Sequence, residues 1–334
     1  MRISATKKTT RFGLLLLVMI VAVALTACGN GNKKSDDNKK VTVNIALNGG
    51  LNLLSIAKEK GWFEEEFAKL NAEVEWQEFQ SSVPLLEGVV SNRVDFSFIG
   101  DGTVVTGKAA NSPFTVISTT GIQGNQNSVI VKTDSPIKSI TDLKGKQVAV
   151  AKGSSAHIFL IKALEKNNMK ESDLKIVQLQ PDEANSAFQT GSIDAWATWD
   201  PFVTTEVKAN RARIVESVET MNIVAPAVMI GRDKFIAEHP DLTTAYLKVY
   251  QKTVDWVNAN KDEAAAILAE QKKMDLDLVK TLVNYTNYIN TPVTEDVQAA
   301  MQSTADILLD AGTIKNKVDI AKVFDNSFIE EALK

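Results

Sequence analysis

The chain of 334 residues has a single cysteine and two histidines. One cysteine cannot form an intrachain disulfide, and neither Cys-x-x-Cys nor His-Glu-x-x-His occurs, so the common redox and zinc motifs are missing. An excess of basic residues is missing too, because the formal net charge is −4, whereas nucleic-acid binding favours a basic stripe. We therefore expect no metal site, no cofactor and no nucleic-acid partner.

A transmembrane-length run is also lacking at the N-terminus. Residues 14–24 are an unbroken apolar run behind basic residues, shorter than the ~20 residues of a membrane span but typical of a signal-peptide core. The following Leu-Thr-Ala-Cys resembles the lipobox of bacterial lipoproteins, in which the cysteine carries the lipid. We expect residues 1–27 to be a lipoprotein signal peptide and Cys28 to anchor the protein on the extracytoplasmic face of the cell membrane; the alternative is a coincidental cysteine.

Residues 29–40 contain no apolar side chain. Such a segment cannot bury enough surface to offset the entropy of folding, so residues 28–40 are predicted to be a disordered tether. From Val41 onward the pattern changes to short apolar strands, turns of small residues and helices with apolar spacing. This pattern indicates an α/β fold.

One strand–turn–helix unit has the features of an anion cradle. Val148–Ala151 reads as a buried strand, and Ser154 or Ser155 is a natural N-cap for the helix that follows. The residues next to this N-cap are all small. There is no Glu or Gln three positions after either serine, so a capping box is not formed. A helix start of this kind has unpaired N–H donors and a partial positive charge. The alternative interpretation is an ordinary capped helix, which explains the same pattern. Lys152 is the only cation near this turn.

A short pattern occurs twice. Residues 94–102 and 193–201 each begin with a β-branched residue and Asp, and each has a second Asp six residues later, Asp101 and Asp200. We interpret this as two α/β lobes, lobe I from residues 41–124 plus 221–334 and lobe II from residues 125–220, with mostly parallel sheets and a helical C-terminal region. Ligands of such sheets bind beyond the carboxyl ends of the strands, where Asn48, Asp101, Ser154 and Asp200 all fall.

The turn Gly153-Ser154-Ser155-Ala156-His157 and the run 191–202, with Gly-Ser-Ile-Asp-Ala-Trp and Trp-Asp-Pro-Phe, are similar to a known family. They resemble substrate-binding proteins of bacterial ABC importers in the aliphatic sulfonate, nitrate and taurine group. The resemblance covers nearly the whole chain after Cys28. It implies a two-lobed, type II periplasmic-binding-protein-like fold with a cleft between the lobes, and a permease and an ATPase as partners.

The function expected from this resemblance is delivery of a small anionic solute, foremost an aliphatic sulfonate, by a monomeric binding protein that is not an enzyme. Nitrate, taurine or a pyrimidine precursor are alternative ligands, because Gly102 is followed by Thr and the first turn is Asn-Gly-Gly. The expected ligand-binding residues follow four strands; they are Asn48, Gly49, Gly50, Gly100, Asp101, Gly102, Ser154, Ser155, Ala156, His157, Trp199 and Asp200.

A secreted enzyme on the same fold is the other alternative. Asp101 and Asp200 could form an acid/base pair, although they could equally cap turns, bind lobe to lobe or meet a ligand amine. His157 could face solvent, the cleft or the core. Trp196 and Trp199 lie three apart on a strand and so face opposite sides; we assign Trp199 to the cleft. Residues 102–109 resemble a P-loop, but Ala109 stands where the Mg²⁺-binding hydroxyl belongs.

Overall fold

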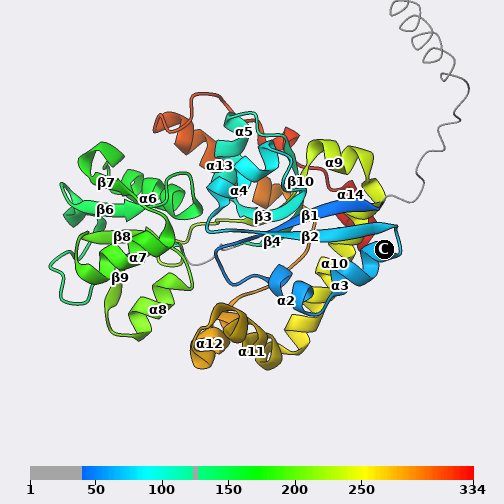
Figure 1. Cartoon of the computed structure of the whole chain (residues 1–334). Coiled ribbons are helices and arrows are strands. Elements are labelled where there is room, and N and C mark those ends of the chain that lie inside the picture. The colour runs from blue at the N-terminus through cyan, green and yellow to red at the C-terminus, as the bar shows by residue number, and fades with distance from the viewer. Residues whose placement is uncertain (1–39, 123–126) are drawn as a thin grey trace, which may run out of the picture. The chain divides into compact units, whose positions relative to one another are not determined.

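The computed structural model describes residues 40–122 and 127–334, in which the strands form two five-stranded sheets (Figure 1). The first sheet, with the helices packed on it, is called lobe I; its strands in spatial order are β2 (Ala72–Phe79), β1 (Val41–Asn48), β3 (Phe96–Gly100), β10 (Ala227–Arg232) and β4 (Phe114–Gly121). The second sheet, called lobe II, has the order β7 (Lys175–Gln178), β6 (Gln147–Val150), β8 (Ala195–Thr198), β5 (Ser128–Lys132) and β9 (Ala212–Ser217). Residues 41–334 form one compact unit.

Each sheet has one strand that runs against the others. In lobe I, β10 is antiparallel to both β3 and β4, whereas β1 is parallel to β2 and β3. In lobe II, β5 is antiparallel to β8 and β9, whereas β6 is parallel to β7 and β8. The reversed strand is in both cases the first one after the chain arrives from the other lobe. The predicted α/β class with mostly parallel sheets is confirmed.

The helices cover the sheets (Figure 1). Those of lobe I are α2 (Leu53–Glu59), α3 (Trp62–Ala68), α4 (Ser82–Val90), α5 (Asp101–Ala109), α9 (Asp233–Glu238), α10 (Pro240–Ala259), α11 (Lys261–Lys272), α12 (Leu276–Tyr285), α13 (Glu295–Asp310) and α14 (Ser327–Ala332). Those of lobe II are α6 (Ser155–Lys166), α7 (Pro181–Thr190) and α8 (Phe202–Lys208). The helical C-terminal region is confirmed. Besides three short 3₁₀ segments, four elements were not predicted, namely α3, α8, α14 and β9, all of them seven residues or shorter.

Helix α6 is shared between the lobes. Its Phe159, Leu160 and Leu164 pack in the core of lobe II. On its other side, Ile158 and Ile161 pack in a core of lobe I that includes residues of α4, α5 and α13. Because both faces of α6 are buried, its N-terminus is held at the boundary between the lobes.

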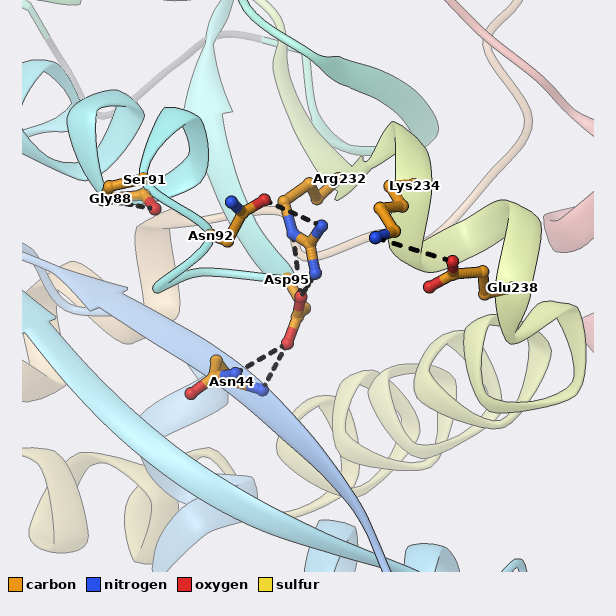
Figure 2. Close-up of polar contacts among 8 residues, drawn as sticks. All are labelled: Asn44, Gly88, Ser91, Asn92, Asp95, Arg232, Lys234 and Glu238. Carbon is orange, nitrogen blue, oxygen red and sulfur yellow. Dashed lines mark hydrogen bonds and ion pairs between the residues drawn. The ribbon is translucent and has the colours of Figure 1, made fainter. Parts of the chain in front are cut away.

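The repeated Asp has the same structural role in both lobes. In lobe I, Asp95 Oδ2 accepts hydrogen bonds of 2.9 Å from the backbone N–H and the side-chain amide of Asn44 in β1, as Figure 2 shows. In lobe II, Asp194 Oδ2 accepts a 2.8 Å bond from the backbone N–H of Gln147 at the start of β6. Lobe I adds Arg232, whose Nε donates to Asp95 Oδ1 at 3.0 Å (Figure 2). The first Asp of each repeat therefore joins neighbouring strands.

Several predictions fall outside the described residues. These are the signal peptide, Cys28, all of the tether except Lys40, and the predicted passage between the lobes at Asn125. In the part of the chain that is described, none of the helices combines the length and the apolar character that a membrane span requires.

Candidate functional site

Three helices begin around a small cavity of about 40 Å³ between the lobes. Its walls include the first residues of α4, α5 and α6, each of which follows the carboxyl end of a strand or the turn after it. The first turn of a helix has N–H groups without intrahelical partners and a partial positive charge. The lining residues are Asn48, Gly49, Ser81, Ser82, Phe98, Gly100, Asp101, Asn127, Ser154, Ser155, Trp199, Ala225 and Ala227.

Glycines allow α5 and α6 to approach each other at this cavity. A Cβ atom on Gly102 would lie 2.0 Å from Cγ1 of Ile158, and one on Gly100 would lie 3.1 Å from Cβ of Ser155. A larger residue at Gly102 would therefore push the two helix starts apart. Ser154 caps α6 by accepting a hydrogen bond from the backbone N–H of His157.

His157 supports the turn before α6. Its Nδ1 accepts a 3.0 Å hydrogen bond from the N–H of Gly153, a residue with a φ of +81°. Since Nδ1 is an acceptor, Nε2 carries the proton and donates to Glu171 Oε2 at 2.9 Å. This bond is the main reason why the pKa of Glu171 is lowered to about 2. His157 is buried and lines neither this cavity nor the larger one described below.

Hydrogen bonds between the lobes enclose the small cavity. Trp199 Nε1 donates to the carbonyl of Gly49 at 3.3 Å, and Ser81 Oγ donates to Gln180 Oε1 at 3.0 Å. Thr103 Oγ1 donates to the carbonyl of Gly153 at 3.3 Å. The lobes therefore lie closed around the three helix starts.

The only ionisable lining residue, among those described, is Asp101, and its carboxylate has a buried cation beside it. Asp101 Oδ2 accepts a hydrogen bond from Thr304 Oγ1 at 2.7 Å and lies 3.4 Å from Lys162 Nζ. Lys162 Nζ in turn donates to Thr304 Oγ1 at 2.7 Å. All three side chains are buried. Because the ion pair balances the carboxylate, the helix starts remain as the positive contribution to the cavity.

Lys152 is the cation that the sequence analysis found near this turn. Lys152 is half exposed and pairs with Glu171 Oε1 at 3.1 Å. The buried cation nearest the cradle is Lys162, which lies in the middle of α6. A lysine inside an otherwise apolar helical stretch was the sequence signal for it.

A larger cavity of about 330 Å³ shares Phe98 and Ala227 with the small one. It is lined by residues 51–54 at the start of α2, residues 120–122 after β4, residues 285–288 after α12, and Asp200, Tyr250 and Leu282. Burial raises the pKa of Asp200, whose Oδ1 accepts hydrogen bonds from the N–H and the hydroxyl of Thr204. Burial also raises the pKa of Tyr288 to about 12.

The structure brings together most of the residues predicted for the site. Asn48, Gly49, Gly100, Asp101, Ser154, Ser155 and Trp199 line the small cavity, and Asp200 lines the larger one. Gly50, Gly102, Ala156 and His157 line neither. Trp196 is buried in the core of lobe II, whereas Trp199, one residue beyond the end of β8, packs with Ala151 and Ala156. Whether these residues contact a ligand stays a prediction.

Sequence reasoning missed the third helix start and the larger cavity. Ser81 and Ser82 open α4 behind Phe79-Gln80, and a Ser-Ser pair before an apolar helical stretch was an available N-cap signal. The larger cavity had no such signal, because its walls come from segments that are more than 200 residues apart in the chain.

Two comparisons show the family. Residues 52–264 match the family model described as NMT1/THI5 like. A protein of Bacillus subtilis (strain 168), named as a candidate aliphatic sulfonates-binding protein, is 38% identical over 322 residues, which are 96% of this chain and 97% of the relative.

Two solved structures have the same fold. The alkanesulfonate-binding protein SsuA from Xanthomonas axonopodis pv. citri, bound to MOPS, matches with a TM-score of 0.81 at 22% identity over 86% of this chain and 99% of its own. The periplasmic aliphatic sulphonate binding protein SsuA from Escherichia coli matches with a TM-score of 0.75 at 24% identity, covering 85% and 92%. These proteins are named as binding proteins, not as enzymes. On the evidence of the family model and the Bacillus relative, this chain belongs to the NMT1/THI5-like family.

Proposed function

We propose that this protein is an extracytoplasmic solute-binding lipoprotein that delivers an aliphatic sulfonate to an ABC importer. Three helix starts around one enclosed cavity, with Asp101 neutralised by Lys162, are the observation that carries the proposal. The name of the Bacillus relative and the names of the two solved structures support the choice of ligand class. The permease and ATPase partners and the lipid anchor on Cys28 belong to the same proposal.

A sulfonate suits this cavity better than an anion that must accept or release a proton. It is fully ionised at physiological pH, and its three oxygens can each accept hydrogen bonds from backbone N–H groups and serine hydroxyls. Nitrate has no carbon substituent, so it would occupy only the small cavity. A sulfonate also has a carbon substituent, for which the adjoining larger cavity offers room. This argument favours sulfonate over the alternative of nitrate.

Ser154→Asp tests the anion cradle. Asp is as good an N-cap as Ser, so the free energy of unfolding should change little. A carboxylate in the cavity repels an anion, and at an effective dielectric of 20 two charges 4 Å apart cost ~4 kcal/mol. We expect calorimetry to show sulfonate binding at least a hundredfold weaker.

Thr294→Asp is the matched control, because Thr294 is the exposed N-cap of α13 and its side chain accepts from the N–H of Val297. It makes the same change of charge and cap outside the cavity and should bind like the wild type. Equal sulfonate affinity in both variants would reduce the start of α6 to an ordinary capped helix.

A further inference from the structure

We propose that the larger cavity is a tail chamber, and that it selects organic sulfonates with an apolar or aromatic body and no second negative charge. The name tail chamber is used for the 330 Å³ cavity from here on. This inference rests on the proposed function, because the sulfonate group itself would sit in the small cavity.

The two cavities adjoin each other, because two residues line both. Phe98 of β3 and Ala227 of β10 line both, and their strands are paired in the sheet, with Ala227 opposite Gly100. The small cavity, at about 40 Å³, has room for a compact anionic group but not for several carbon atoms as well. A carbon chain leaving the sulfonate past Phe98 therefore enters the tail chamber.

The walls of the tail chamber are suited to an apolar or aromatic body. Leu51, Leu54 and Leu282 contribute aliphatic surface, and Tyr250 and Tyr288 contribute rings. Burial raises the pKa of both tyrosines, so their hydroxyls stay neutral at physiological pH. Ligand pockets commonly combine such apolar walls with a few polar groups.

The charge of the tail chamber disfavours a second anion. Asp200 is the only ionisable carboxyl in its lining, and no Lys, Arg or His is found there among the described residues. Two polar partners of Asp200 are the N–H and hydroxyl of Thr204, which are neutral. A neutral or cationic tail meets no repulsion here, whereas an anionic tail does.

One buried donor on the wall lacks a protein partner. Asn52 caps α2, and its Oδ1 accepts a 3.2 Å hydrogen bond from the N–H of Ser55, which sets the orientation of the amide. Its Nδ2 is buried and has no hydrogen-bond partner in the described structure. Leaving a buried donor unpaired is costly, and Asn52 is one of the few polar residues in the wall of the tail chamber.

The wall formed by α12 also contacts the opposite lobe. Lys208 of α8 donates to Thr281 Oγ1 at 2.8 Å, and Figure 1 shows α12 next to α8. The tail chamber is therefore bounded by lobe I elements that reach lobe II, so its shape depends on the same closure that encloses the small cavity.

A chain-length series tests the tail chamber. Calorimetry on the purified protein would use methanesulfonate, butanesulfonate and hexanesulfonate. Each buried methylene should raise the affinity about fourfold. If methanesulfonate binds and the longer ligands bind no tighter, the tail chamber is refuted while the proposed function stands. If none of the sulfonates binds, both are refuted.

Ile122→Trp should fill the chamber from its rim, because Ile122 lines the chamber and is 46% exposed, which leaves space for a larger side chain. We expect methanesulfonate to bind within about twofold of the wild type and the increase with chain length to disappear. Val90→Trp is the control, since Val90 is an exposed residue at the end of α4 that lines neither cavity. If the affinity of Ile122→Trp rises with ligand chain length as steeply as that of the wild type, the larger cavity is not the tail chamber.

The charge preference has its own test at pH 8. Butane-1,4-disulfonate should bind at least about a hundredfold more weakly than butanesulfonate, because its second sulfonate faces Asp200. Asp200→Asn should reduce this difference in affinity. The amide oxygen of the Asn can still accept the hydrogen bonds from Thr204. Equal binding of the two ligands to the wild type would overturn the exclusion of a second anion.

Discussion

Lys162 is the residue that makes the small cavity suitable for an anion. It lies on the helix whose N-terminus lines the cavity, and it reaches across to Asp101 at the start of α5. Asp101 without this partner would be a buried negative charge beside the proposed sulfonate. Asp101 of α5 contacts Lys162 of α6 and Thr304 of α13, so it joins a helix of lobe II to two helices of lobe I, as one of its predicted roles requires.

Lys162→Met should be strongly destabilising. It leaves the Asp101 carboxylate buried without a cation, and loss of one partner of a buried ion pair costs about 3–5 kcal/mol. The double variant Lys162→Met with Asp101→Asn removes both charges and should recover most of the stability. Urea denaturation of the single and double variants measures the difference. If the double variant is no more stable than the single one, the ion pair is not what holds these helices together.

The same local pattern stabilises the two lobes to different degrees. Its first Asp is Asp95, just before β3, in lobe I and Asp194, just before β8, in lobe II. Asp95 and Asp194 both accept a hydrogen bond from the backbone of the neighbouring strand. Asp95 is buried and also binds Arg232 of the reversed strand β10, which joins three strands of the sheet (Figure 2). Asp194 is exposed, and it accepts a hydrogen bond from the backbone N–H of Gln147.

Asp95→Ala should therefore cost much more stability than Asp194→Ala. The first leaves the largely buried Arg232 without its carboxylate, at about 3–5 kcal/mol, and the second removes a single hydrogen bond, at about 0.5–1.5 kcal/mol. Urea denaturation of both variants gives the two values, and sulfonate affinity should be unchanged in each where the protein is folded. Similar losses in the two variants would contradict the special role of the Asp95–Arg232 pair.

The protein as a whole is proposed to work beside a membrane, and the anchor and the binding site are separate in the chain. Cys28 lies outside the described residues, whereas every cavity residue belongs to the compact unit 41–334. A diacylglyceryl group supplies the two chains that stable anchoring requires. Nothing in the small cavity or the tail chamber depends on it.

Cys28→Ser should move the protein out of the membrane fraction or leave it as uncleaved precursor. Fractionation followed by immunoblotting checks the location, and calorimetry on the purified variant should give the wild-type sulfonate affinity. A variant that remains in the membrane with its signal peptide removed would show that the lipobox resemblance is coincidental. A changed affinity would show that the two ends of the chain are coupled.

The sequence by itself determined the α/β class, the order of most elements and the N-cap that opens α6, because these depend on short-range periodicity and on residues a few positions apart. It also assigned Trp199 rather than Trp196 to the cleft, and the structure has Trp199 at the small cavity and Trp196 in the core of lobe II. The tertiary structure alone decided that three helix starts meet, that His157 holds Gly153, and that Lys162 pairs with Asp101. It also decided that residues near 52, 121 and 286 enclose one chamber. These outcomes depend on how the two lobes pack, and contacts between distant segments leave no periodic signal in the chain.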